Sequence, residues 1–404
     1  MDATGTGPLA QLGRRDLFTT LQAQAYLAHA GISPISDPVR TAMREVVDRA
    51  CAHGVAAFGN NLEIRAELRG RLASLIETEP ENLGFVLNTG HGLAAIATAL
   101  PLRPGDRIAL MEGEYPSNVS VFQQIARRTG ASVVWLKAGD FAVDTEAALG
   151  VLAHELARGL RLVAVSAVQF SSGLQMPLER IGSLCRHYGT WFSVDAVQAL
   201  GAVPLSMGKL PVDFMACGAH KWLMGAEGAG FVYVHPAAME RLQPVLVGHM
   251  SHRGAMEVLL GDPEQLHYQR PLLTKPEVFE GGMLSSVGLA ALNAAVGLIQ
   301  SIGVSAVFDH LQAYHDRLEP LLLERGFVTL RSQQSEQRSG MLCLRPPAGV
   351  HAGLLAAGLA ARGVYVSSPD GVVRFAPHWP NDLNEVPCVV QAIDSVIADG
   401  SAQV

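Results

Sequence analysis

Short apolar runs alternate with amphipathic segments along most of the chain. Each run has the length of a buried strand of a parallel sheet. Such runs occupy 84–88, 107–111, 132–136, 161–166, 191–195, 212–217 and 230–234. The segments between them predict helices, among them 92–100, 118–128 and 178–187. This alternation predicts an α/β fold, a mostly parallel, doubly wound sheet with helices on both faces.

The pattern changes near Phe279-Glu-Gly-Gly282. A polar loop region precedes this block, a long helix rich in Ala, Leu and Val follows it, and shorter strands appear at 340–344 and 372–375. A chain of 404 residues exceeds one ordinary hydrophobic core. We therefore expect a large domain over 41–285 and a smaller C-terminal domain over 286–404.

Composition narrows the class of protein. Hydrophobic residues make up 49% and charged residues 17%, as in a soluble α/β protein. The net charge of −7 gives no reason to expect nucleic acid or an acidic membrane as a partner. No apolar run approaches a membrane span, and residues 1–15 lack the order of a signal peptide. The five cysteines are scattered and lack metal-ligand spacing, so we expect buried thiols, no metal site and a cytoplasmic protein.

Two neighbouring strands end in polar residues with catalytic potential. Asp195 and Gln198 follow one apolar run, and His220 and Lys221 follow the next. Ligands bind at the carboxyl ends of parallel strands. A carboxylate and an amine on one rim fit a pyridoxal phosphate site, in which a lysine forms a Schiff base and an aspartate pairs with the pyridinium nitrogen. Apolar neighbours should desolvate Lys221 and lower its pKa toward that of a nucleophilic amine.

With these Asp-Ala-Val-Gln and His-Lys-Trp blocks, the chain resembles the class V aminotransferase family of fold type I pyridoxal phosphate enzymes. That family includes cysteine desulfurases, selenocysteine lyases, kynureninases and isopenicillin N epimerases. The resemblance, from about Tyr26 to the C-terminal helix, implies a mostly parallel seven-stranded sheet and an N-terminal segment 1–40 that joins the smaller domain. It makes Lys221 the internal aldimine lysine, Asp195 the ring-nitrogen partner and Gln198 a contact to the ring hydroxyl. It also implies a homodimer, with 279–286 as the segment donated to the neighbouring subunit.

The block Asn88-Thr-Gly-His-Gly92 joins a predicted strand to a helix, where free backbone N–H groups bind phosphate. We expect the phosphate site to involve Thr89, Gly90, His91 and His220. Compared with the desulfurase pattern, three phosphate-binding hydroxyl residues are replaced, by Gly90, Gly218 and Met283. The phosphate site should therefore depend more on backbone amides, Thr89 and His220.

Two further residues are candidates for contact with the cofactor ring. By resemblance, Tyr115 takes the place of the ring-stacking histidine of desulfurases. A stacked tyrosine holds the ring plane but is a poorer proton shuttle near neutral pH. The alternative is a partly buried loop aromatic. Gln169, after the run that ends at Val168, would lie on the same rim near the ring hydroxyl.

Substrate recognition points to Arg374, in the strand-like run 372–378. Its planar fork suits bidentate binding of an α-carboxylate, and the family has an arginine in a matching block. His29 is a second candidate that faces the substrate, although a packing or capping role is as plausible.

The segment 364–371 before Arg374 contains no cysteine, whereas desulfurases carry a catalytic cysteine there. Persulfide formation on the protein is therefore disfavoured. The leading hypothesis is transamination or β-elimination of a small amino acid. Epimerisation is an alternative, with Lys221 on one face of the carbanion and Tyr115 or a histidine on the other. A sugar aminotransferase and a non-catalytic protein that keeps the fold are further alternatives. The first would not require Arg374, and the second is opposed by intact Lys221, Asp195, His220 and Arg374.

Overall fold

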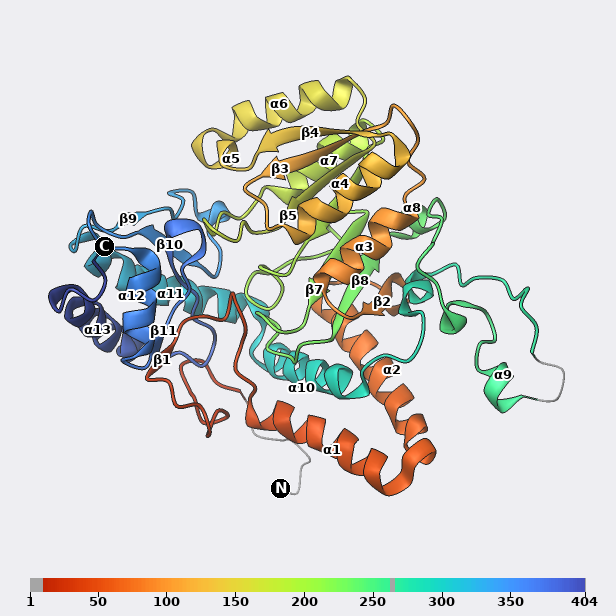
Figure 1. Ribbon diagram of the computed structural model, residues 1–404, viewed down its shortest axis with the longest axis horizontal. Helices are drawn as coiled ribbons and strands as arrows, with labels where there is room; N and C mark the ends of the chain where they lie inside the picture. The colour runs from red at the N-terminus through yellow and green to blue at the C-terminus, as the bar shows by residue number, and fades with distance from the viewer. Residues whose placement is uncertain (1–9, 262–265, 404) are drawn as a thin grey trace.

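The computed structural model describes residues 10–261 and 266–403, and its centre is a seven-stranded sheet with strand order β2-β8-β7-β6-β5-β3-β4 (Figure 1). The strands are β2 (Leu83–Val86), β3 (Arg107–Glu112), β4 (Ser132–Lys137), β5 (Leu162–Ser166), β6 (Trp191–Asp195), β7 (Phe214–Gly218) and β8 (Gly230–Val234). All but β8 run parallel to one another, and β8 is antiparallel to both neighbours. The predicted mostly parallel α/β sheet is confirmed.

The two faces of this sheet are covered by different helices. Alternate strand residues such as Val163 and Val165 belong to the core beneath α6 (Thr145–Ala157) and α7 (Leu178–His187). Their neighbours Leu162 and Ala164 belong to the core beneath α3 (Thr89–Ala99) and α4 (Ser117–Thr129). Because successive strand side chains point to opposite faces, a strand buried on both faces is apolar throughout.

Two helices precede the sheet and were not among the predicted elements. They are α1 (Asp37–His53) and α2 (Phe58–Leu75), joined by η1 (Gly54–Ala57), and they pack on α10 (Ser286–Ile302). A single long helix is predicted after Gly282, but the structure has two helices there, α10 and α11 (Val304–Leu323), which meet at an angle of 76°. In the described part of the chain no single helix is long and apolar enough to cross a membrane, although this bent pair passes the same test of length and composition.

The C-terminal part contains a three-stranded antiparallel sheet of order β12-β10-β9. The elements of the C-terminal part after α11 are β9 (Val328–Thr329), β10 (Leu342–Arg345), α12 (Ala352–Ala360), β11 (Val364–Tyr365), β12 (Val373–Phe375) and α13 (Val386–Ala398). Strand β1 (Ala25–Tyr26) pairs in parallel with β11, and Leu27 shares a core with Phe375. The start of the described chain therefore packs against its end.

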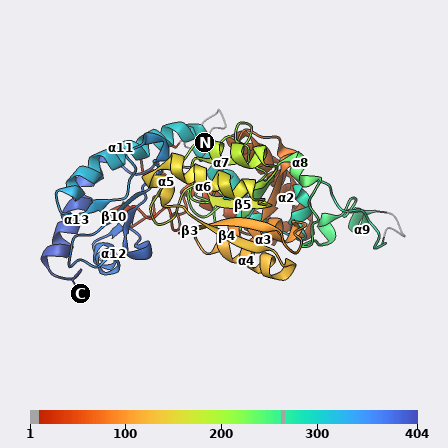
Figure 2. The ribbon, with the colours of Figure 1, turned by 90° about the horizontal axis from the view of Figure 1, so that it is seen from above.

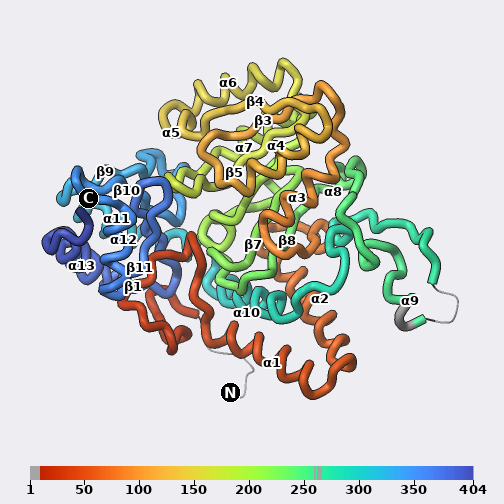
Figure 3. Tube along the Cα trace, in the orientation of Figure 1, coloured from red at the N-terminus to blue at the C-terminus, as the bar shows by residue number. Residues whose placement is uncertain are grey.

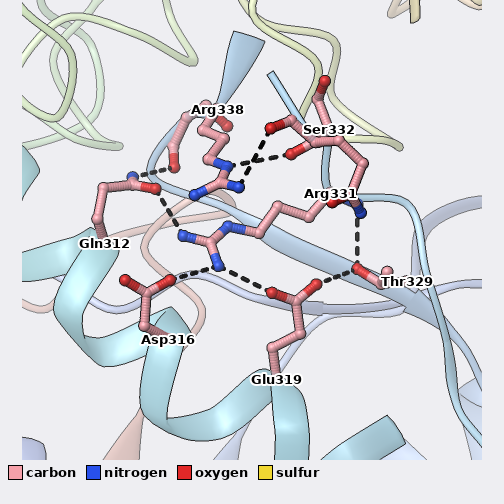
Figure 4. A network of polar contacts seen from close by, with 9 residues as sticks. Gln312, Asp316, Glu319, Thr329, Arg331, Ser332 and Arg338 are labelled. Carbon is pink, nitrogen blue, oxygen red and sulfur yellow. Dashed lines mark hydrogen bonds and ion pairs between the residues drawn. The ribbon is translucent and has the colours of Figure 1, made fainter. Parts of the chain in front are cut away.

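The segment between β9 and β10 connects this part to the large sheet. Arg331 forms ion pairs with Asp316 and Glu319 of α11 (Figure 4). A few residues later, the side-chain amide of Gln337 donates to the Phe141 carbonyl at 2.9 Å. Strand β10 follows directly and pairs Cys343 with Arg374, so this connection helps to set the position of β12 relative to the large sheet.

A long excursion between β8 and α10 extends away from the rest of the molecule (Figures 1, 2 and 3). It includes η3 (His249–Ser251) and α9 (Glu257–Leu260), and η4 (Pro276–Glu280) brings the chain back to β2. A Cβ at Gly84 would lie 2.2 Å from the Pro276 carbonyl oxygen, so only glycine permits this close approach. The remaining short helices are η2 (Pro80–Asn82), α5 (Asp140–Val143), α8 (Pro236–Met239), η5 (Ser335–Gln337), η6 (Pro369–Gly371) and η7 (Leu383–Glu385).

Candidate active site

A cavity of about 520 Å³ lies at the carboxyl ends of β5, β6 and β7, where N-terminal residues and β12 meet the large sheet. The predicted residues that line it are Thr89, Gly90, Tyr115, Asp195, Gln198, His220, Lys221 and Arg374. They come from separate connections after the strands and from the C-terminal part. Tertiary folding therefore brings most of the predicted set into one concave space.

Lys221 follows β7 and is largely buried. Burial lowers the pKa of its amine, the nearby Arg374 charge lowers it further, and the Asp195 carboxylate opposes both. Its Nζ lies 5.4 Å from the centre of the Tyr115 ring. A lowered pKa increases the fraction of unprotonated amine, the form that attacks a carbonyl carbon.

Asp195 is the last residue of β6, and its Oδ1 accepts a hydrogen bond from the Val197 N–H at 2.9 Å. Burial raises the pKa of this carboxyl to about 7, and the charge of Glu114 adds to the rise, while Val197 and Lys221 oppose it. A cation held against Asp195 would restore its ionised form. A protonated pyridine nitrogen is such a cation.

The start of α3 provides donors for an anion. The Asn88 side chain caps this helix by accepting the His91 N–H at 2.8 Å, which leaves the Thr89 and Gly90 amides without acceptors inside the helix. The Thr89 Oγ1 is buried and has no hydrogen-bond partner within the described residues. The Ser117 Oγ lies 3.7 Å from the position that a Cβ at Gly90 would take. Unpartnered donors at a helix start fit a phosphate group.

Gly218 lacks the hydroxyl side chain of the desulfurase pattern, and a side chain at this position would be crowded by its neighbours. A Cβ at this position would lie 3.1 Å from the Thr89 Oγ1 and 3.3 Å from the His220 Cε1. A serine there would press on both residues. Thr89 thus places its hydroxyl beside the position left open by Gly218.

Arg374 lies on β12 with its guanidinium buried. Its Nε donates to the Ser367 Oγ at 2.9 Å, and its Nη1 donates to the Phe170 carbonyl at 2.7 Å. Burial lowers the pKa of this guanidinium, and the residue lines the cavity. An arginine held on two sides in this way presents its remaining donors to a ligand at little further entropic cost.

Three predicted residues do not line the cavity. His29 is buried and its Nδ1 bonds the Ser33 Oγ at 2.8 Å. The His91 Nδ1 accepts the Leu87 N–H at 3.2 Å. Gln169 donates to Glu114 at 2.9 Å. Their direct contact with cofactor or substrate stays a prediction.

Gln198 lines the cavity, but both ends of its side-chain amide are engaged. Its Nε2 donates to the Ala30 carbonyl at 3.0 Å, and its Oε1 accepts the Trp222 Nε1–H at 2.9 Å. One amide hydrogen remains for the predicted contact with a ring hydroxyl.

Sequence reasoning missed Glu114, Ser117 and Phe170. Glu114 is buried and accepts hydrogen bonds from Ser166, Gln169 and Asn118. Ser117 begins α4, and Phe170 forms an edge contact with Tyr115 at 5.4 Å between ring centres. All three adjoin residues that had been identified, and the hydroxyl at a helix start was the available signal for Ser117.

All five cysteines fall within the described residues, and none lines the cavity. Cys185, Cys217 and Cys343 are buried, and burial raises the pKa of each thiol, that of Cys343 to about 12. Cys51 and Cys388 are exposed elsewhere. The described part of the chain also holds no cluster of His, Cys, Asp and Glu that could bind a metal ion.

The residues around the cavity fit pyridoxal phosphate. Asp195 would hold the ring nitrogen, and Thr89 with the α3 amides would hold the phosphate, while Lys221 offers an amine of lowered pKa in the same cavity. The unpartnered Thr89 hydroxyl is the strongest sign of a missing anionic partner, because buried hydroxyl groups are normally hydrogen-bonded.

The family model "Aminotransferase class-V" matches residues 25–376. A probable cysteine desulfurase of Chlamydia muridarum is 30% identical over 76% of this chain and 76% of the relative. Isopenicillin N epimerase of Streptomyces clavuligerus is 24% identical over 82% of this chain and 84% of the relative. A solved structure of a C-DES mutant, with glycine covalently linked to the PLP cofactor, superposes with a TM-score of 0.82 at 22% identity, and the match covers 96% of this chain and 99% of that chain.

Proposed function

Because this chain belongs to the class V aminotransferase family and is a pyridoxal phosphate-dependent enzyme, we propose that it acts at the α-carbon of a small amino acid, by transamination or β-elimination. One observation carries the proposal: Lys221, Asp195 and Arg374 line one cavity. An amine, a ring-nitrogen partner and a carboxylate receptor are the groups that such chemistry needs.

Each residue has a defined task in this proposal. The bound cofactor supplies an electron sink for the bonds of the α-carbon. Asp195 holds the ring nitrogen protonated, and Arg374 orients the substrate through its carboxylate. Lys221 would hold the cofactor through its Nζ, and the same Nζ would carry the proton of the α-carbon. The Tyr115 ring lies close to the Lys221 Nζ and would restrict the position of the cofactor ring.

Sulfur transfer to a protein thiol stands last among the alternatives. Several relatives are probable cysteine desulfurases, but a protein nucleophile for sulfur would have to reach the substrate. The segment beside Arg374 offers Ser367, whose hydroxyl accepts from the Arg374 Nε. Sulfide released from a bound cysteine would then arise by β-elimination with Lys221 as the base.

Epimerisation is a second candidate, supported by Tyr115. Inversion at a carbon requires proton carriers on both faces of the carbanion. The Tyr115 side chain and the Lys221 amine line the same cavity, and one relative is isopenicillin N epimerase. Exchange of the α-hydrogen in deuterated water with formation of the D-enantiomer, without keto acid, would favour this candidate over transamination.

We also propose that the enzyme is a homodimer. The long excursion after β8 and the segment before α10 expose apolar side chains that a second copy would cover, with Val245 58% exposed, Tyr268 82% exposed and Met283 65% exposed. Segment 279–286 would be donated to the neighbouring subunit. Light scattering of active protein should give twice the chain mass, and an active monomer would contradict this proposal.

The deciding experiment compares Lys221→Ala with Lys209→Ala. Lys209 is an exposed lysine paired with Glu77, so it controls for the loss of a lysine. Wild type and Lys209→Ala should bind pyridoxal phosphate, and borohydride should fix the cofactor covalently to both proteins. Both should also turn over at least one amino acid of a panel, with keto acid, pyruvate, sulfide and inverted enantiomer as the products measured. Turnover by Lys221→Ala at the wild-type rate would refute the assignment.

A further inference from the structure

The backbone that carries Lys221 is held by two chain segments that are distant in the sequence. The carbonyls of His220, Lys221 and Trp222 each accept a hydrogen bond from one of them. The Ser33 N–H donates to the His220 carbonyl at 2.8 Å, and the Ser33 hydroxyl donates to the Lys221 carbonyl at 2.7 Å. The His378 Nε2 bonds the Trp222 carbonyl at 2.8 Å. Ser33 is separated from Lys221 by 188 positions.

The hydrogen-bond pattern defines which nitrogen of each histidine carries the proton. The Ser33 hydroxyl gives its only hydrogen to the Lys221 carbonyl, so its oxygen must accept the bond from the His29 Nδ1–H at 2.8 Å. The His378 Nδ1 accepts the Trp379 N–H at 2.7 Å, so its Nε2 carries the hydrogen given to Trp222. The His378 imidazole is therefore neutral, and burial lowers the pKa of His29 well below its ordinary value, so His29 is a neutral donor as well.

The surroundings leave these groups few alternatives. His29, Ser33 and His378 are all buried, and the two imidazoles meet edge to face at 5.3 Å between ring centres. A Cβ at Gly201 would lie 2.2 Å from the Trp222 carbonyl oxygen, so the backbone after the lysine also packs directly on another segment. A buried hydrogen-bonded network of this kind rigidifies the group that it holds.

We propose that Ser33, oriented by His29, and His378 are positioning residues for Lys221: they fix its backbone so that Nζ reaches the cofactor aldehyde. The proposal rests on the proposed function, because it assumes that Lys221 is the residue that links to the cofactor. None of the three residues lines the cavity, and in this proposal they act through the peptide groups of residues 220–222. Pre-organisation of a reacting group shortens the search for its productive geometry.

The test compares Ser33→Ala with Ser36→Ala. Ser36 is a matched control, since it is equally buried at 3% exposure, lies in the same segment, and its hydroxyl has no hydrogen-bond partner in the described structure. Apoprotein of each variant is mixed with pyridoxal phosphate, and two quantities are followed over time: total bound cofactor, and the cofactor that borohydride traps on Lys221, which gives the rate of trapping. Thermal unfolding is measured in parallel.

For Ser33→Ala we expect the rate of trapping to fall about fivefold, the factor that corresponds to one typical hydrogen bond. Total cofactor bound should match that of Ser36→Ala. The Tm of Ser33→Ala should be the lower of the two, because the Lys221 carbonyl and the His29 Nδ1–H lose a buried partner, so trapping is compared well below both Tm values, where both variants are folded. Equal trapping rates in the two variants would overturn the proposal. If wild-type protein shows no trapped cofactor at all, the proposed function fails instead, and the two failures are thereby distinguished.

A second pair tests the histidine. His29→Asn keeps an N–H donor close to the position of Nδ1, whereas His29→Leu removes it. Trapping should be slowed in His29→Leu and restored toward the wild-type rate in His29→Asn. Equal rates in both variants would remove His29 from the positioning set.

Discussion

Replacing Glu114 by glutamine tests whether one buried carboxylate organises the wall of the cavity. Its Oε1 accepts the Ser166 N–H at 2.6 Å and the Gln169 amide at 2.9 Å. Its Oε2 accepts the Ser166 hydroxyl and the Asn118 amide, the latter at 3.2 Å. The carboxylate therefore joins β5 to the start of α4, and Glu114 itself precedes Tyr115 in the loop between β3 and α4.

The expected loss of stability in Glu114→Gln follows from the four hydrogen bonds that the carboxylate accepts. A glutamine oxygen can keep the two bonds to Oε1, and its NH₂ can donate to the Ser166 hydroxyl. The NH₂ faces the Asn118 amide donor-to-donor until that amide turns to present its Oδ1, which has no partner within the described residues. The bonds then lose their charge assistance, and a bond to a charged group is worth about 1.5 to 3 kcal/mol against about 1 kcal/mol for a neutral one. Burying a neutral amide in place of a charge offsets part of this. We expect unfolding to become easier by about 2 kcal/mol on this balance.

The same substitution should change how cofactor binding depends on pH. The Glu114 charge adds to the rise of the Asp195 pKa to about 7, so its removal lowers that pKa. Below its pKa Asp195 is protonated and cannot pair with a pyridinium. Affinity of the wild-type apoprotein for pyridoxal phosphate should therefore fall as the pH drops through about 7, and in Glu114→Gln this fall should occur at lower pH.

Glu112→Gln is the matched control, since Glu112 is an exposed glutamate that ends β3, two residues before Glu114. Urea unfolding and titration of each apoprotein with pyridoxal phosphate from pH 5.5 to about 8.5, a range that brackets an ordinary histidine and a raised carboxyl pKa, would report both effects. Identical stability and an identical pH profile for the two variants would refute the reasoning.

Four further outcomes are expected. Asp195→Ala should abolish most turnover while it leaves protein yield largely unchanged, and wild-type kcat in this variant would reduce Asp195 to a cap of the turn after β6. Arg374→Lys should raise KM for the amino acid, with kcat/KM lower by about 100-fold, roughly the 3 kcal/mol of a bidentate charged contact; an unchanged KM would exclude carboxylate binding there. Burial lowers the pKa of His378 from 6.5 to about 4. Its contribution to the free energy of unfolding is complete above pH 6.5, and about 3 kcal/mol of it should be lost as the pH falls from 6.5 to about 4. His378→Gln should therefore flatten the acid side of the stability curve measured by urea unfolding. Single substitution of each cysteine should leave turnover intact, and a persulfide trapped on Cys343 or Cys388 would restore the desulfurase hypothesis.

The direction of β8 shows how a fold prediction depends on connections as well as on strands. Its apolar run predicted a buried strand, and that strand is present. Only the residues 219–229 separate it from β7, and they form no helix. A parallel return needs a crossover of a dozen residues or more, usually helical, so this connection permits only an antiparallel strand. The bend between α10 and α11 has a similarly local cause in Gly303, whose φ is +88°.

By itself the sequence determined the α/β class, the family, and the strand ends that carry Asp195 and Lys221, because apolar periodicity and strand termini are local properties of the chain. Tertiary structure alone decided that Glu114 reaches β5 across 52 positions and that Ser33 reaches Lys221 across 188. It also decided that His29 hydrogen-bonds Ser33, outside the cavity lining. The physical reason is that a buried polar side chain finds its partner among whatever groups packing brings beside it, and that choice leaves no periodic trace in the sequence.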